Sequence, residues 1–210
     1  MDDYRDAIAS CCRQLRLSAN LADHAFAIQG ETHQEYLYNL LSEEIKCRKA
    51  ARIGKLIHSA GFPVQHNFAA FQPDEVQFPS GVTPESLKAL EFFHAGNNLV
   101  MYGSTGTGKT MLSICIGMEA CRSGIPVKFF RTASLINQLS EAQERGSLAQ
   151  LHKKLAKADI LILDEFGYVP YNRTGAQLLF DYLSEIHEKK VIILNTNLEF
   201  SRWVNVLYDE

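Results

Sequence analysis

The sequence lacks the features that mark secreted, membrane-bound or disulfide-stabilised proteins. Its acidic start, MDDYRDAIAS, has no apolar segment of the kind found in a secretory signal. No apolar run approaches the ~18 residues that cross a bilayer. The five cysteines are an odd set without C-x-x-C pairs, which argues against a disulfide framework and against a zinc cage. We therefore expect a cytoplasmic protein without membrane contacts, whose cysteines are reduced, buried thiols.

The chain also lacks an excess of positive charge. Its 21 Lys and Arg residues face 24 Asp and Glu residues, so the net charge is −3 at pH 7. Any contact with nucleic acid must therefore come from a local basic patch, because the chain as a whole does not attract phosphate. Its 210 residues, 46% of them hydrophobic, are enough for one to two globular domains.

Proline is absent from residues 3–60 and concentrated just afterwards. Four of the six prolines lie between residues 61 and 86, and proline disfavours helix at its own position and at the one before. Within the first part, apolar residues recur at helical spacing. These are Tyr36, Leu37, Leu40, Leu41 and Ile45. We therefore predict a small N-terminal helical domain over residues 1–60, followed by a proline-rich linker or arm over residues 61–90.

From residue 91 onward, apolar runs alternate with helical stretches. The four runs are NLVMY (98–102), VKFF (127–130), ILIL (160–163) and VIIL (191–194). Strands that alternate with helices imply βαβ units. We therefore predict an α/β core over residues 91–210, built on a parallel sheet with helices on both faces.

The segment GSTGTGKT follows the first of these strands and precedes a helical stretch. It fits G-x-x-x-x-G-K-[ST] in the strand–loop–helix context that the phosphate-binding loop requires. Glycines let the backbone N–H groups wrap a phosphate at the positive end of a helix. The loop predicts a nucleoside triphosphate site made by Gly103, Ser104, Thr105, Gly106, Thr107, Gly108, Lys109 and Thr110. Lys109 would reach the outer phosphates, and the Thr110 hydroxyl would bind Mg²⁺.

Two adjacent carboxylates follow the third apolar run, in DILILDEFGY. The carboxyl ends of strands are where open α/β sheets bind ligands. Asp164 there can hold Mg²⁺, while Glu165 can orient or deprotonate a water that attacks the γ-phosphate. A small-molecule kinase must exclude water and would not need the second carboxylate. The pair therefore favours an ATPase over a phosphotransferase.

The fourth strand runs into Asn195-Thr196-Asn197. A parallel strand that ends beside the first would bring an amide near the γ-phosphate, where it could position the attacking water. We assign this role to Asn197, which lies just past the expected strand tip, although asparagine is also a common turn residue.

These segments together resemble the IstB-type helper ATPases of bacterial insertion-sequence transposition, relatives of the DnaC-type helicase loaders in the AAA+ group. The resemblance runs along almost the whole chain. Its most specific parts are LDEFGYVP (163–170) and NLEFSRW (197–203), whereas the phosphate loop and the acidic pair are shared by many ATPases. It implies an AAA+ core that follows a helical accessory domain along the chain, and ATP and Mg²⁺ as cofactors. It further implies ATP-dependent assembly into a homo-oligomer on duplex DNA. It also implies a partner transposase.

By position, the resemblance supports the same roles for Lys109, Thr110, Asp164, Glu165 and Asn197. The sequence departs from the family at His187-Glu188-Lys189-Lys190, where tyrosine and arginines are usual. It also lacks, after Trp203, the helix whose arginine would reach a neighbouring subunit's ATP, and the further strand of the sheet. We therefore expect a C-terminally truncated chain that binds ATP but hydrolyses it weakly or not at all, because such an arginine is worth ~10³–10⁵ in rate.

A basic stripe lies in KCRKAARIGK, where Arg48, Arg52 and Lys55 gather on one helix face. Such a stripe can be an ordinary solvated face, or it can lie on a DNA backbone without reading bases. The resemblance leaves both interpretations open.

Three functions therefore remain. The chain is a DNA-associated ATPase that assists transposition, a helicase loader of the DnaC type, or a nucleotide-binding remnant without catalysis. NLEFSRW favours the first.

Overall fold

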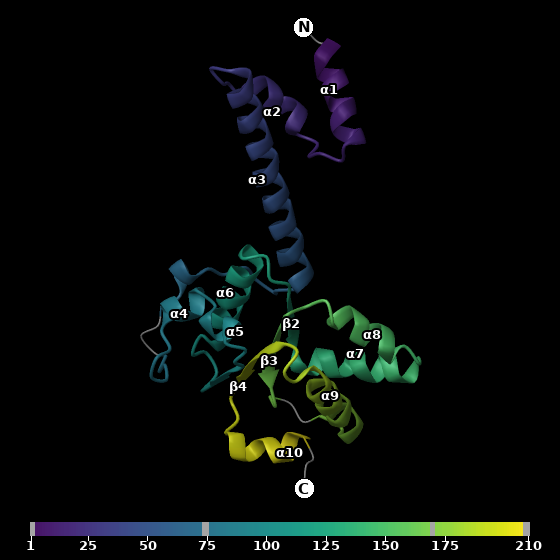
Figure 1. Ribbon diagram of the computed structural model, residues 1–210. Helices are drawn as coiled ribbons and strands as arrows, with labels where there is room; N and C mark the ends of the chain where they lie inside the picture. The colour runs from purple at the N-terminus through teal and green to yellow at the C-terminus, as the bar shows by residue number, and fades with distance from the viewer. Residues whose placement is uncertain (1–2, 73–75, 169–170, 208–210) are drawn as a thin grey trace. The chain divides into compact units, whose positions relative to one another are not determined.

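The computed structural model describes residues 3–72, 76–168 and 171–207 (Figure 1). Val169 and Pro170 of the LDEFGYVP segment, Pro73 of the linker and the last three residues lie outside this part of the chain. Contacts divide the chain into two units, Met1–Lys55 and Leu56–Glu210. The division falls inside a helix, five residues before the end of the helical domain that the proline pattern indicates.

The first unit is helical. It contains α1 (Asp3–Gln14), α2 (Leu21–Ala27) and most of α3 (His33–Ala60). Its small apolar centre includes Cys12, Leu21 and Ala22. Apolar residues at helical spacing along α3 do form a helix, as predicted, but Leu37, Leu41 and Ile45 remain about half exposed or more.

A buried carboxylate holds the turn between α1 and α2 against α3. Glu44 is 4% exposed and accepts hydrogen bonds from the Ser18 N–H at 3.0 and 3.1 Å and from the Arg48 Nε at 2.6 Å. Arg48 also donates to the Arg16 carbonyl at 2.7 Å. Burial alone would raise the pKa of Glu44, but the hydrogen bonds from Arg48 and Ser18 outweigh it and hold the pKa below its ordinary value.

The second unit is a parallel four-stranded sheet with strand order β1-β4-β3-β2. The strands are β1 (Leu99–Tyr102), β2 (Val127–Arg131), β3 (Ile160–Phe166) and β4 (Val191–Thr196). Each strand overlaps one predicted apolar run, and β2, β3 and β4 extend beyond theirs at the carboxyl end. The edge strands are β1 and β2. Since every neighbouring pair is parallel, the carboxyl ends of all four strands lie at the same end of the sheet.

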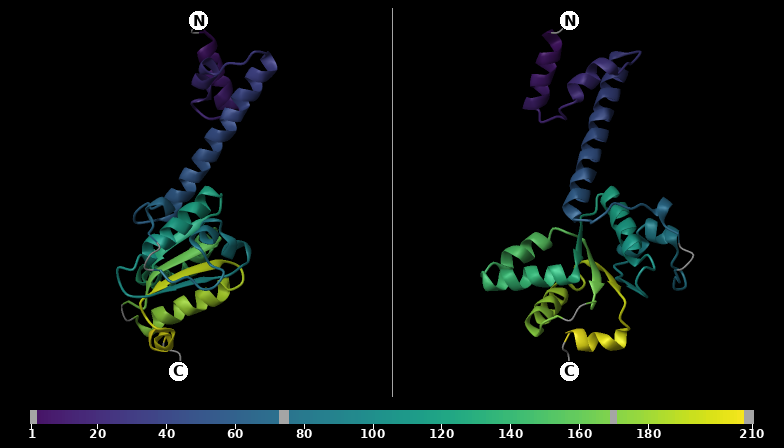
Figure 2. Two further views of the ribbon diagram at one scale, coloured as in Figure 1. Left: turned by 90° about the vertical axis from the view of Figure 1, so that its left-hand side faces the viewer. Right: turned by 180° about the vertical axis from the view of Figure 1, so that it is seen from behind.

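Helices cover both faces of the sheet, as predicted (Figures 1 and 2). Side chains along β3 alternate between the two faces, and each face carries an apolar cluster. Ile160 and Ile162 belong to the cluster that contains α6 (Lys109–Arg122), while Leu161 and Leu163 belong to the second cluster. The helices of that second cluster are α7 (Thr132–Glu144), α8 (Leu148–Leu155) and α9 (Arg173–Ile186). A Cβ on Gly175 would meet Ile136 at 2.5 Å, so glycine is what allows α9 to approach α7.

The proline-rich segment packs onto the α6 side of this unit. It contains the short helix η1 (Phe68–Ala70) and α4 (Pro84–Lys88), followed by α5 (Glu91–His94). Its aromatic residues Phe62, Phe68, Phe71 and Phe78 contribute to the α6 cluster. Thr83 and Ser86 form a capping box around Pro84, which explains why a helix begins there in spite of the prolines. The chain's described part closes with η2 (Phe200–Arg202) and α10 (Trp203–Leu207).

The cysteine prediction was correct in part. All five thiols are free, and Cys12, Cys115 and Cys121 are buried. Burial raises the pKa of Cys115 and of Cys121 to about 11. However, Cys11 is exposed and Cys47 is half-buried. Cys11 and Cys12 are neighbours on one helix, so their side chains point about 100° apart and cannot share one buried face.

Among the helices of the described residues, none combines the length and the apolar character that a membrane span requires.

We expect the Glu44→Gln substitution to destabilise the first unit by about 1–3 kcal/mol, because an amide replaces the charged acceptor of three hydrogen bonds. The folded-state pKa of Glu44 is lowered, so its contribution is present above the unfolded pKa of about 4.3 and is lost as pH falls below it. Urea unfolding followed by circular dichroism at pH 7 and at pH 4 measures both effects. The exposed Glu31→Gln is the control, and equal stability of the two variants would contradict the assignment.

Candidate nucleotide-binding site

The phosphate loop joins β1 to α6, in the context that the sequence predicts. Gly106 and Gly108 have φ angles of +88° and +84°, in the left-handed region that glycine adopts at little cost. Gly108 is the N-cap of α6, so the loop leads into the positive end of that helix. The backbone therefore has the form required to receive an anion.

Lys109 spans this loop. Its ammonium donates to the carbonyls of Gly103 and Ser104, both at 2.7 Å. Burial lowers the pKa of Lys109, and the nearby negative charge of Asp164 partly opposes this. The Thr107 hydroxyl donates to the Ser104 carbonyl at 2.9 Å, which ties the two ends of the turn together. Lys109 thus holds a positive charge at the centre of the phosphate loop.

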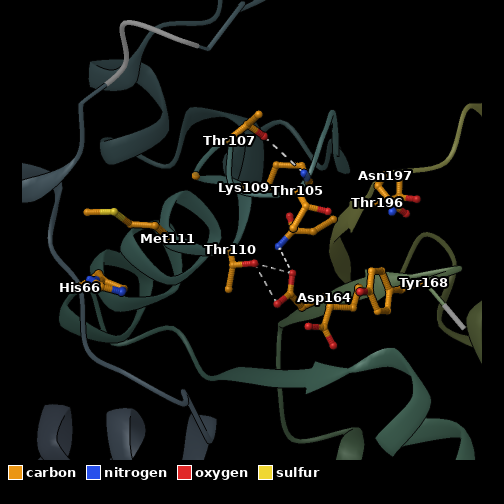
Figure 3. Close-up of a pocket in the computed structure, with 14 residues that line it drawn as sticks. His66, Thr105, Thr107, Lys109, Thr110, Met111, Asp164, Tyr168, Thr196 and Asn197 are labelled. Carbon is orange, nitrogen blue, oxygen red and sulfur yellow. Dashed lines mark hydrogen bonds between the residues drawn. The ribbon is translucent and has the colours of Figure 1, made fainter.

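The side chains of Thr110 and Asp164 point toward each other in the pocket, as Figure 3 shows. The Thr110 hydroxyl lies 2.9 and 3.0 Å from the two oxygens of the Asp164 carboxylate. Asp164 is only 4% exposed. A hydroxyl and a buried carboxylate at this separation make an oxygen donor set of the kind that Mg²⁺ prefers.

A β-bulge orients the second carboxylate. Leu163 pairs with Leu194 and Phe166 with Thr196, so Asp164 and Glu165 together lie opposite one residue of β4. Glu165 has a φ of +57°, a left-handed conformation that is uncommon outside glycine. In a regular strand, adjacent side chains would point to opposite faces. The bulge lets both Asp164 and Glu165 line one pocket.

The pocket has a volume of about 460 Å³, within the usual range for small-ligand sites. Its lining includes six of the eight loop residues, from Thr105 to Thr110, together with Asp164, Glu165 and Asn197. The nucleotide, metal and catalytic residues predicted from the sequence are thus brought together, apart from Gly103 and Ser104, whose carbonyls bind Lys109 instead. Asn197 is exposed and directly follows β4; its role in positioning water stays a prediction.

The structure adds residues that the sequence analysis missed. Asn195 is buried at the end of β4 and donates to Asp164 at 2.8 Å and to the Ser113 hydroxyl at 2.9 Å. Arg131, the last residue of β2, lies 3.7 Å from the Glu165 carboxylate. A polar residue that interrupts an apolar strand was the available signal for Asn195. Nothing in the sequence indicates the Arg131 contact, which depends on the pairing of β2 with β3.

His66 and Met111 also line the pocket. Figure 3 shows them on the side of Thr110 away from Asp164 and Tyr168. His66 and Met111 therefore lie at a different end of the pocket from the carboxylates. His66 belongs to the proline-rich segment, whose place beside the loop arises from its packing on α6.

The predicted basic stripe is not uniform. Arg52 and Lys55 are exposed on α3, whereas Arg48 pairs with the buried Glu44. Arg48 therefore has a structural role within the first unit that the sequence analysis did not anticipate.

Comparison with known proteins identifies relatives of this chain. The profile of the family described as "IstB-like ATP binding protein" matches residues 15–210. The "Insertion sequence IS5376 putative ATP-binding protein" of Geobacillus stearothermophilus is 30% identical, over 98% of this chain and 84% of its own length. The corresponding IS21-like protein of Bacteroides fragilis is 26% identical, over 100% of this chain and 82% of that protein.

Among solved structures, AMPPCP-bound DnaA from Aquifex aeolicus superimposes with a TM-score of 0.51 at 24% identity. The match covers 58% of this chain and 38% of DnaA, and it indicates a shared fold. With a family profile that covers nearly the whole chain and a phosphate loop in its expected form, the chain belongs to the IstB-like ATP binding protein family.

Proposed function

We propose that this protein is a Mg²⁺-dependent ATPase that assists insertion-sequence transposition on DNA. The observation that carries the proposal is the bulge in β3, because it turns Asp164 and Glu165 toward the same phosphate loop. A nucleotide-binding protein without hydrolysis has no need for the second carboxylate. The names of the relatives, which are ATP-binding proteins of insertion sequences, support the biological setting.

Each group has a distinct part in the proposed reaction. Thr110 and Asp164 would hold Mg²⁺, which neutralises charge on the phosphates when it is bound. Lys109 stabilises the outer phosphates, and Glu165 orients a water and accepts its proton. Asn197 positions that water from the end of β4. His66 and Met111 lie where the base of the nucleotide would extend.

The DNA and protein partners are further parts of the proposal. Arg52 and Lys55 are free of the Glu44 hydrogen bonds that engage Arg48, so they are the better candidates for contact with duplex DNA without sequence preference. A transposase encoded with the same insertion sequence is the proposed protein partner, and the ATPase is proposed to act as an ATP-dependent homo-oligomer in the cytoplasm. A helicase loader would use the same nucleotide site, and the insertion-sequence names of the relatives favour the transposase.

We expect Glu165→Gln to keep ATP binding and to lower hydrolysis about 10²–10⁴-fold, the usual contribution of a general base. Lys109→Ala should instead lose ATP binding, because it removes the positive charge from the phosphate loop. A fluorescent ATP analogue measures binding, and phosphate release with and without duplex DNA measures turnover. The difference between the wild-type chain and Glu165→Gln also tests the weak turnover expected from the sequence. Equal loss of analogue binding in both variants would contradict the separate roles.

The two asparagines should behave differently. Asn195→Ala removes a hydrogen bond to Asp164, so we expect a higher Mg²⁺ concentration at half-maximal hydrolysis. Asn197→Ala should lower turnover with little change in that concentration, since Asn197 is proposed to act on the water. Mg²⁺ titrations of hydrolysis at saturating ATP distinguish the two effects. If Asn197→Ala alone shifted the Mg²⁺ dependence, the two assignments would be reversed.

For DNA binding, we expect the double substitution Arg52→Ala and Lys55→Ala to weaken binding for all sequences. It should reduce the slope of log affinity against log salt by about 2, because each phosphate contact contributes about 0.9. Fluorescence anisotropy with an arbitrary duplex at several salt concentrations measures the slope. Lys153→Ala with Lys157→Ala removes the same charge from exposed positions beside the sheet. An equal effect of this control pair would mean that net charge, and not the α3 stripe, determines binding.

A further inference from the structure

Three side chains of metal-binding type gather in the helical unit. They are His24 of α2 and Glu43 and Cys47 of α3, all partly buried. One ligand atom of each lies within 4.8 Å of the others. The described contacts of the phosphate loop include none of these residues.

The arrangement follows from how α2 packs on α3. Glu43 and Cys47 are four residues apart on α3, so they share one face of that helix. The Tyr36 hydroxyl donates to the Ala25 carbonyl at 2.7 Å, and the Ser18 N–H donates to Glu44. These bonds hold α2 alongside α3 and bring His24 to the face that carries Glu43 and Cys47.

An unsatisfied atom in this cluster indicates a ligand. The Nδ1 atom of His24 is buried and has no hydrogen-bond partner among the described residues. Leaving a buried polar atom without a partner is costly, and a metal ion would satisfy it. The Asn20 side-chain amide also donates a hydrogen bond to the Cys47 sulfur at 3.7 Å. Hydrogen bonds of this kind to a ligating atom orient it and tune its affinity.

We propose that His24, Glu43 and Cys47 bind one Zn²⁺ ion, with water as the fourth ligand. Nitrogen, oxygen and thiolate donors are the set that zinc uses, whereas the soft thiolate disfavours Mg²⁺ and Ca²⁺. Ligand atoms around tetrahedral zinc are about 3.3–3.8 Å apart at normal bond lengths. A separation within 4.8 Å therefore requires only small side-chain rotations. The Cys47 thiol gives its proton to solvent on binding.

The proposed ion would clamp α2 to α3 in a unit with a small apolar centre. Lys46 lies 3.2 Å from Glu43, but it is mostly exposed and can release that carboxylate. None of the three ligands has a part in the proposed ATP chemistry, so failure of either proposal would leave the other untouched.

The test uses the full chain without an affinity tag, stripped of metal with a chelator. Titration with Co²⁺ as a spectroscopic probe should give one equivalent with a thiolate-to-metal absorption band, and Zn²⁺ should displace it. Cys47→Ser should remove the band, whereas Cys11→Ser, which changes an exposed cysteine outside the cluster, should retain it. Asn20→Ala should weaken binding about 10–100-fold, the usual effect of an outer-shell partner.

Circular dichroism identifies any variant that fails to fold. In that case His24→Gln and the isosteric Glu43→Gln decide the question by the amount of zinc that elemental analysis finds after dialysis; each should lose it. The proposal is wrong if the wild-type chain takes up less than one equivalent of Co²⁺ and Zn²⁺. It is also wrong if Cys11→Ser removes the band while Cys47→Ser keeps it.

Discussion

The hydrogen bonds of Asp164 hold the nucleotide site together. Its carboxylate accepts from Thr110 of α6 and from Asn195 of β4, and its backbone carbonyl accepts from the Thr132 hydroxyl at the start of α7. One residue of β3 therefore links the helix of the phosphate loop, the neighbouring strand and a helix on the opposite face. The bonds from Asn195 and Thr132 are buried and the bond from Thr110 is partly buried, so competition with water weakens them little. The position of the loop relative to the sheet depends on them.

The neighbouring Glu165 shows what this arrangement costs. A left-handed conformation at a residue other than glycine is unfavourable, by roughly 1–3 kcal/mol in sparsely populated regions. The surrounding bonds of Asp164 and the pairing of Phe166 with Thr196 keep the strand in this form. Local strain of this kind is common at functional sites, where it aims a side chain that a regular strand would direct elsewhere. Here it brings two adjacent carboxylates into one pocket and places Glu165 beside Arg131.

The helical unit depends on a different buried carboxylate. Glu44 accepts hydrogen bonds from the turn before α2 and from Arg48 of α3. These bonds hold His24 across from Glu43 and Cys47. The same contact divides the basic stripe, since Arg48 is used inside the unit while Arg52 and Lys55 face solvent. In both units, then, one carboxylate that is nearly excluded from water determines which nearby side chains are available for ligands.

Local patterns in the sequence were enough for the elements and for part of the site. Strands are short apolar runs, and the glycines of GSTGTGKT are required wherever a loop must wrap a phosphate, so β1 to β4 and the residues from Thr105 to Thr110 could be predicted. Tertiary structure alone decided the rest. The bulge at Asp164 and Glu165, the buried amide of Asn195, the approach of His66 and the cluster around Cys47 all depend on contacts between segments far apart in the chain. A sequence pattern records spacing along the backbone, whereas these features depend on which strands pair and which helices pack.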